Sequence, residues 1–155
     1  MSWDISFTQA ETPPPPVAEM PDDWRGVAWG PAADLRAALS AQFPAIDWSD
    51  PLWGIYDGAG FSMEFDLGSD DPVEGFVVHM RGGGEAAITA VERLLALPGW
   101  YGLDCAAEEW VHHGADLRAS WERFQSARDT VTQKPEAGGS PRSGLLSFLR
   151  SLFGR

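Results

Sequence analysis

The chain has 155 residues, of which 44% are hydrophobic, with 8 Trp and 8 Phe, and it carries a formal charge of -12 at neutral pH. This length and apolar content predict one folded domain with a real core and exclude an intrinsically disordered chain. The acidic balance argues against nucleic-acid binding through a basic stripe, because an acidic body repels a phosphate backbone.

The charge is unevenly distributed along the chain. Residues 134–155 contain four basic residues and one acidic residue, a net charge of +3, so residues 1–133 carry -15. The single cysteine, Cys105, excludes an intramolecular disulfide and a CxxC metal motif. No stretch approaches the about 20 apolar residues of a membrane span, and the start lacks a signal-peptide pattern. We expect a reduced, cytoplasmic protein without a cofactor.

The first third of the chain predicts a strand, a connector and a helix. "WDISFTQ" (residues 3–9) alternates apolar and polar residues, which is typical of a strand with one buried face. Residues 11–24 contain four consecutive prolines, which favour an extended surface connector and form a possible docking motif. Residues 30–44 predict a helix with an apolar stripe of Leu35, Leu39 and Phe43.

The middle of the chain predicts a three-stranded antiparallel meander. "LWGIYD" and "FSMEFDL" are joined by "GAG", whose glycines suit a tight hairpin, and "GFVVHMR" (residues 75–81) follows a second turn. Residues 84–99 and 114–131 predict two further helices, and residues 100–106 a short strand between them. The order β-α-β-β-β-α-β-α predicts an α+β fold, with an antiparallel sheet of four to five strands and helices on one face.

The meander brings three charged side chains together. If Phe65 pairs with Val78, Glu64 lies opposite His79, and Arg81 is diagonal to Glu64. A histidine oriented by a carboxylate can perform general acid-base chemistry, so Glu64, His79 and Arg81 are candidate catalytic residues. The alternatives are an exposed ladder of charge pairs and a partner-binding face.

Other motifs have both a functional and a structural interpretation. Gly82, Gly83 and Gly84 precede a helix and form either an anion-binding turn or a plain strand-to-helix turn. His112 and His113 suggest a metal, but no second cluster completes a zinc site, so no metal is expected. Cys105 has no activating cation beside it in sequence, so we interpret it as a core residue.

Acidic loops and tryptophans form a second candidate surface. Carboxylates steer a basic partner and exposed aromatics act as anchors. The candidate binding residues are Trp24, Trp29, Trp48, Asp47, Asp50, Asp70 and Asp71.

The C-terminal part predicts two segments outside a domain of residues 1–133. Residues 134–144 are rich in Gly, Pro and Ser and predict a linker. The tail, Leu145–Arg155, is apolar with two arginines, and as a helix it would gather Leu145, Phe148, Leu149 and Leu152 on one side. Such a tail could lie on a membrane, dock into a partner groove or fold back on its own body.

Four pieces of the sequence, "DWSDPLWG", "FSMEFDLG", "VVHMRGGG" and "LDC", resemble a pattern in a family of small acidic bacterial proteins without assigned activity. The likeness covers about residues 3–130 and implies a shared fold, but it brings no catalytic residue. By size and charge alone, such domains are similar to immunity proteins, which neutralise a cognate toxin.

Three functions are consistent with the sequence. The first is a non-enzymatic module that binds a basic protein partner, for which an immunity protein is the concrete example. The second is a small hydrolase or ligand-binding enzyme that uses Glu64, His79 and Arg81. The third is an adaptor that acts through the proline-rich segment and the tail.

Overall fold

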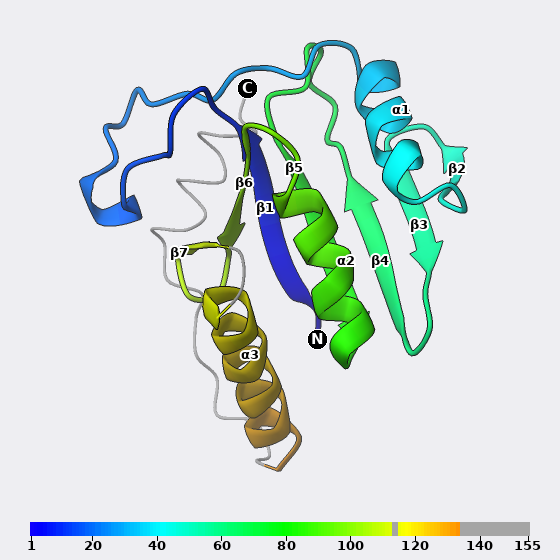
Figure 1. The fold of residues 1–155 in the computed structure, drawn as a ribbon, viewed down its shortest axis with the longest axis vertical. Coiled ribbons are helices and arrows are strands. Elements are labelled where there is room, and N and C mark those ends of the chain that lie inside the picture. The colour runs from blue at the N-terminus through cyan, green and yellow to red at the C-terminus, as the bar shows by residue number, and fades with distance from the viewer. Residues whose placement is uncertain (113–114, 134–155) are drawn as a thin grey trace.

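The structure is a computed structural model that describes residues 1–112 and 115–133 (Figure 1). The predictions made for His113, for the linker and for the tail lie outside these residues. In chain order the described elements are β1 (Trp3–Gln9), a 3-10 turn η1 (Val17–Glu19), α1 (Ala32–Gln42), β2 (Asp47–Asp50), β3 (Trp53–Asp57), β4 (Phe61–Asp66), β5 (Phe76–Gly82), α2 (Glu85–Leu95), β6 (Trp100–Asp104), β7 (Glu109–Val111) and α3 (Ala115–Gln133).

The strands form one antiparallel sheet with the order β2-β3-β4-β5-β1-β6-β7. The predicted α+β class is confirmed, but the predicted number of four to five strands is wrong, because the described sheet has seven. The two missed strands, β2 and β7, lie at the two ends of the sheet. Each is short, and β2 also carries a register shift against β3, so neither shows a clear alternation in sequence.

All three helices cover the same face of the sheet (Figure 1). Alternate residues of the central strands point toward them, so Ile5, Phe65 and Val78 are fully buried. The predicted stripe of α1 is buried as expected, and Leu117, Trp121 and Phe124 of α3 are also buried. The hydrophobic core therefore lies between the sheet and the helices.

A buried carboxylate ties the end of β6 to two other elements. Asp104 is 2% exposed, and its carboxylate accepts a hydrogen bond from the hydroxyl of Ser120 in α3 and one from Trp3 Nε1 of β1 at 3.4 Å. The backbone N–H groups of Ala106 and Ala107 donate to its other oxygen at 2.9 and 3.1 Å. Because a buried charge must be compensated by polar partners, Asp104 fixes the β6–β7 turn against β1 and α3.

The proline-rich segment covers part of the opposite face. Trp110 Nε1 of β7 donates to the carbonyl of Pro15 at 2.9 Å, and the N–H of Val27 donates to the carbonyl of Gln9 at 2.6 Å. A Cβ atom on Gly26 would lie 2.4 Å from Thr8 Oγ1, so only glycine permits this close approach. Residues 11–27 therefore cover the outward side of β6 and of the second half of β1, where Ser6 and Thr8 are 3% and 2% exposed. On this face, no described helix or strand lies over β3, β4 and β5.

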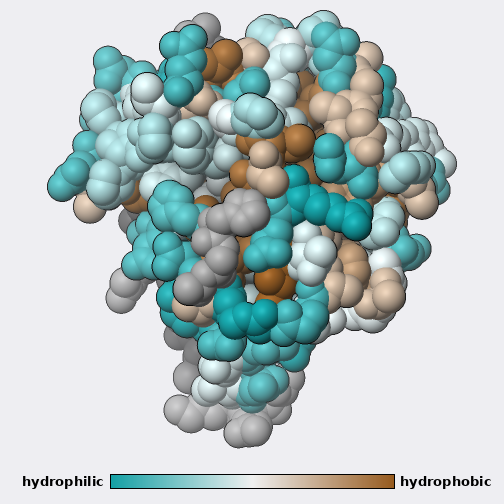
Figure 2. Space-filling view, viewed as in Figure 1, coloured by the Kyte–Doolittle hydropathy of each residue, from teal (hydrophilic) through white to brown (hydrophobic). Residues whose placement is uncertain are grey.

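The helix-covered face is mostly hydrophilic where described residues are in view, with hydrophobic residues in small patches (Figure 2). None of the described helices is both long enough and apolar enough to cross a bilayer.

Candidate functional site

The side of the sheet that the helices leave uncovered is the candidate site. We call it the open sheet face and define it by the outward residues of β3, β4 and β5 together with Asp4 at the start of β1. The antiparallel pairing places one residue of each strand in a row across this face. The rows are Ile55–Glu64–His79–Asp4, Trp53–Asp66–Val77–Ser6 and Asp57–Ser62–Arg81.

His79 lies at the centre of the open sheet face. Its Nδ1 atom is 2.9 Å from Asp4 Oδ1, and the ring stacks on Trp53 with centroids 5.5 Å apart and an interplanar angle of 19°. The hydroxyl of Ser2 donates to the same Asp4 oxygen at 2.5 Å. The side chain of His79 is 22% exposed. The histidine is thus fixed on one side by a carboxylate and on one ring face by an indole.

The contact between His79 and Asp4 shifts both pKa values. The pKa of His79 is raised above 6.5, mainly by the hydrogen bond with Asp4, against an opposing effect of burial. The nearby carboxylates of Asp66 and Glu64 raise it further. For Asp4, burial acts to raise the pKa, but the hydrogen bonds from His79 and Ser2 outweigh it, and the pKa falls below 3.8.

The predicted register of β4 and β5 is confirmed, since Phe65 pairs with Val78 and Glu64 lies opposite His79. The contacts differ from that expectation, because Glu64 Oε1 binds Arg81 Nη1 at 2.6 Å while His79 binds Asp4. Asp4 was missed because the sequence does not reveal that β1 pairs with β5. The alternation within residues 3–9 does show that Asp4 and Ser6 share a polar face.

The chemistry available to this cluster is limited. A carboxylate-oriented histidine can move a proton, but nucleophilic catalysis also needs a hydroxyl or thiol within reach of it. Three serines lie on this side of the sheet: Ser2 donates to Asp4, Ser62 is opposite Arg81, and Ser6 is buried. Among the described residues, none of them is hydrogen-bonded to His79. His79 instead pairs with Asp4, and Arg81 pairs with Glu64.

An apolar strip runs beside these charge pairs. Ile55 is 43% exposed, and in the register it stands between Asp47 of β2 and Glu64 of β4. Trp53, two residues before it on the same side of β3, is partly buried against His79. A large aliphatic side chain at the surface between two carboxylates is the combination that a partner with both basic and apolar groups would contact.

The three tryptophans predicted to be exposed are partly buried, and their role in partner binding stays a prediction. Trp29 packs against Phe76 and Trp100 with ring centroids 5.3 and 5.2 Å away, so it belongs to the edge of the core. Trp48 also packs against the core, and its Nε1 donates to Ser40 Oγ at 3.0 Å. Trp24 is partly buried against Trp110. Turn-rich surroundings suggested loops, but the aromatic rings fill the space where those loops meet the sheet.

The predicted acidic binding residues lie at the two ends of β2 and in the loop before β5. Asp47 Oδ1 accepts a hydrogen bond from the N–H of Ser49 at 2.8 Å, and Asp50 Oδ1 accepts one from the N–H of Leu52 at 2.9 Å. The hydroxyl of Ser49 also donates to Asp47 Oδ1, at 2.6 Å, and this hydrogen bond is the main reason why the pKa of Asp47 is lowered, followed by the one from the Ser49 N–H. Asp71 is exposed and Asp70 is partly buried in the loop before β5. A role for these carboxylates in partner binding stays a prediction.

The three glycines connect β5 to α2. Gly82 and Gly84 have φ angles of +80° and +97°, and the N–H of Gly83 donates to the carbonyl of Gly60 at 3.2 Å. The first helical residue, Glu85, forms a two-pronged ion pair with Arg118 of α3, with both distances 2.7 Å. This helix start already holds a carboxylate, and anion binding at Gly82–Gly84 stays an untested prediction.

The remaining candidates do not gather into a site. His112 is exposed, and no group of three metal-ligating side chains forms among residues 1–112 and 115–133. Cys105 is buried in the core region, and burial raises the pKa of its thiol to about 12, so it is protonated and unreactive near neutral pH.

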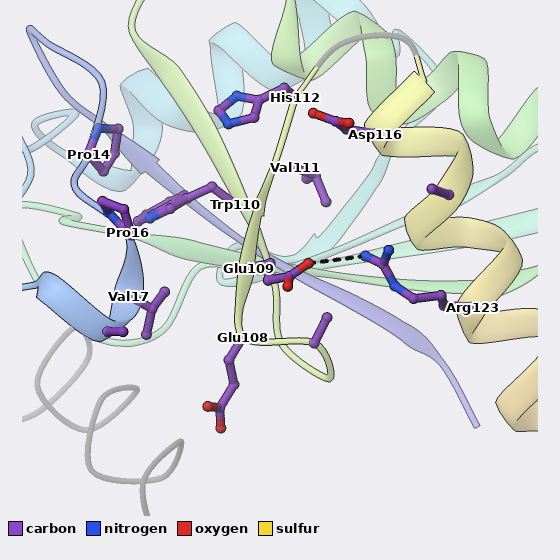
Figure 3. A pocket seen from close by; sticks show the side chains of 13 residues that line it. Pro14, Pro16, Val17, Glu108, Glu109, Trp110, Val111, His112, Asp116 and Arg123 are labelled. Carbon is purple, nitrogen blue, oxygen red and sulfur yellow. Dashed lines mark hydrogen bonds and ion pairs between the residues drawn. The ribbon is translucent and has the colours of Figure 1, made fainter.

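Two cavities lie away from the open sheet face. One, of about 680 Å³, opens between the proline-rich segment, β7 and α3 (Figure 3). The other, of about 430 Å³, lies between the N-terminus, the turn after β6 and α3, and Asp104 lines it. No side chain of the Glu64, His79 and Arg81 cluster lines either cavity.

The sequence and the structure were compared with known proteins. No family model matches the sequence, and no curated protein and no solved structure matches the chain.

Proposed function

We propose that this protein is a non-enzymatic binding module that receives a basic protein partner on the open sheet face. The observation that carries the proposal is the exposed side chain of Ile55, which stands on an uncovered sheet between the carboxylates of Asp47 and Glu64. An apolar centre with a polar, charged rim is the general arrangement of a protein–protein interface.

The charge of this surface defines the partner. Four acidic residues, Asp4, Asp57, Glu64 and Asp66, lie outward on the open sheet face, against one arginine and one histidine. Residues 1–133, which contain this face, carry a formal charge of -15. Such a field speeds the association of a basic protein and opposes an acidic one. An immunity protein that neutralises a basic toxin is the concrete form of this proposal.

Affinity capture with matched variants tests the proposal. The tagged full chain is exposed to lysate of its native host beside the variants Ile55→Lys and Thr89→Lys. Thr89 is exposed on α2, so it supplies the same added charge on the opposite face. A partner of the open sheet face should bind wild type and Thr89→Lys equally and Ile55→Lys about thirtyfold more weakly, as for a central contact residue.

Two outcomes would contradict the proposal. Equal retention by all three proteins would place the contact elsewhere. The absence of any stoichiometric partner, at both low and moderate salt, would remove the binding function itself.

A second candidate function is hydrolysis or ligand binding, favoured by the contact of His79 with Asp4 at 2.9 Å. It requires a small molecule to bind beside Arg81 and the glycine turn. Incubation with simple ester and phosphate-ester substrates should then give turnover that His79→Gln abolishes. Turnover that His79→Gln leaves unchanged would exclude this cluster as its origin.

A further inference from the structure

The larger cavity has apolar walls and an acidic rim. We call it the β7 groove; its walls include Pro14, Pro16, Val17, Trp110 and Ala119. The carboxylates of Glu108 and Asp116 also line it, and Glu109 is bound to Arg123 at 3.4 Å (Figure 3). Three separate elements, η1, β7 and α3, supply these side chains, so the groove is a product of the folded chain.

The groove runs beside an unpaired edge of the sheet. β7 is the last strand in the order and pairs only with β6 among the described strands. Backbone groups along such an edge, together with apolar walls, are what a peptide segment uses to dock. The groove is therefore suited to an apolar segment that brings positive charge.

The chain itself contains a segment of that chemistry. Residues 145–155 hold six large apolar residues and the two arginines Arg150 and Arg155, without an acidic residue. The segment of residues 134–155 has a net charge of +3, whereas residues 1–133 carry -15. The positive charge of this segment complements the acidic rim of the β7 groove, and its apolar residues suit the apolar walls.

The distance along the chain permits the contact. α3 contributes Arg123 to the groove and ends at Gln133, ten residues or about 15 Å farther along the helix. Residues 134–144 can span up to about 36 Å when extended, so residue 145 can return to the groove. A tether of this length provides an effective concentration on the order of millimolar, so even a weak contact would be populated.

We propose that the β7 groove binds the C-terminal segment of residues 145–155 of the same chain. The apolar side chains of the segment contact Val17 and Trp110, and its arginines face Glu108 and Asp116. This contact is independent of the open sheet face, because it uses different strands.

A spin label on the segment tests this contact in the full chain. Ser151→Cys supplies one reactive thiol, since Cys105 is buried with a pKa of about 12 and does not react in the folded protein. In the NMR spectrum the label should remove most of the intensity of the Trp110 Nε1–H signal and of the Val17 and Ala119 amides. The Trp53 Nε1–H signal on the open sheet face should keep its intensity.

Two variants make the test specific. Leu149→Asp in the segment, which leaves the described fold untouched, and Val17→Asp in the groove should each restore the Trp110 signal. The control Leu52→Asp, at an exposed leucine between β2 and β3, should leave the loss unchanged.

Three results would overturn the proposal. The first is an unaffected Trp110 signal in the labelled wild type, whether or not the chain sediments with phosphatidylserine vesicles. The second is a loss of signal that persists in Leu149→Asp. The third is a loss that appears only between chains, when an isotope-labelled chain is mixed with a separate spin-labelled one.

Discussion

At the scale of single residues, His79 is the most informative reporter of the open sheet face. Its pKa is raised chiefly by Asp4, with a smaller contribution from Glu64. We therefore expect Asp4→Asn to lower the pKa of His79 toward 6.5, and Glu64→Gln to lower it less. NMR titration of the imidazole signals measures both, and a pKa that is unchanged in Asp4→Asn would show that the contact is absent in solution.

The same pair makes stability depend on pH within a defined window. The raised pKa of His79 stabilises the fold below pH 6.5, and that stability is lost as the pH rises through the folded value. The lowered pKa of Asp4 stabilises the fold above pH 3.8, and that stabilisation is lost as the pH falls through the pKa of the folded state. The pair therefore stabilises the fold most between pH 3.8 and pH 6.5. Its contribution to the free energy of unfolding is no more than about 1 kcal/mol, because both groups are partly exposed.

Asp104 should matter more for stability than any charge on the open sheet face. Asp104→Ala removes the acceptor for Ser120, Trp3 and two backbone N–H groups, and buried donors without an acceptor cost about 1–3 kcal/mol. We expect a loss of that size in the free energy of unfolding, measured by urea denaturation. Ser120→Ala, the matched control, keeps three of the four donors satisfied and should cost less, whereas equal losses would contradict this role of Asp104.

At the scale of elements, the turn between β5 and α2 depends on the backbone of Gly82 and Gly84. Both have positive φ angles, which cost a side chain about 1–2 kcal/mol. A Cβ atom on Gly82 would also lie 2.4 Å from the carbonyl oxygen of Gly60, whereas one on Gly84 would meet nothing within 4 Å. Gly82→Ala should therefore lower the melting temperature more than Gly84→Ala, and the reverse order would contradict this geometry.

The sequence predicts elements with strong periodicity well and their pairing poorly. The stripe of α1 and the pairing of Phe65 with Val78 were predicted correctly, because alternation and a short hairpin determine both. The pairing of β1 with both β5 and β6 was not, since contacts between residues about 75 and 100 positions apart leave no local pattern. Short edge strands such as β2 are stabilised by their neighbour and were missed for that reason.

The candidate site was predicted only in part, because some of its contacts are local in sequence and others are long-range. Glu64, His79 and Arg81 lie on one face, as the β4–β5 register requires. Asp4 comes from a distant strand and Trp53 stacks on His79, and neither contact could be read from spacing. The partial burial of the three tryptophans was not predicted, because composition indicates turns but does not show which side chains pack beneath them.

At the scale of the whole molecule, the two faces of the sheet are covered differently. The three helices cover one side of the sheet, and residues 11–27 cover the outward side of β6 and of the second half of β1. The surface that remains contains paired charges, an exposed isoleucine and an excess of carboxylates. A basic partner should therefore bind faster at low salt than at high salt, since screening shortens the reach of this field.

Hydroxyl-radical footprinting of the full chain, alone and bound to its captured partner, tests this account most directly. In the free protein we expect oxidation of Ile55 and Trp53 but not of buried Trp3 and Trp121. In the complex, Ile55 and Trp53 should become protected, while the oxidation of residues on the helix-covered face stays unchanged. Protection confined to the helix-covered face, with Ile55 oxidised as in the free chain, would contradict the claim that the open sheet face binds the partner.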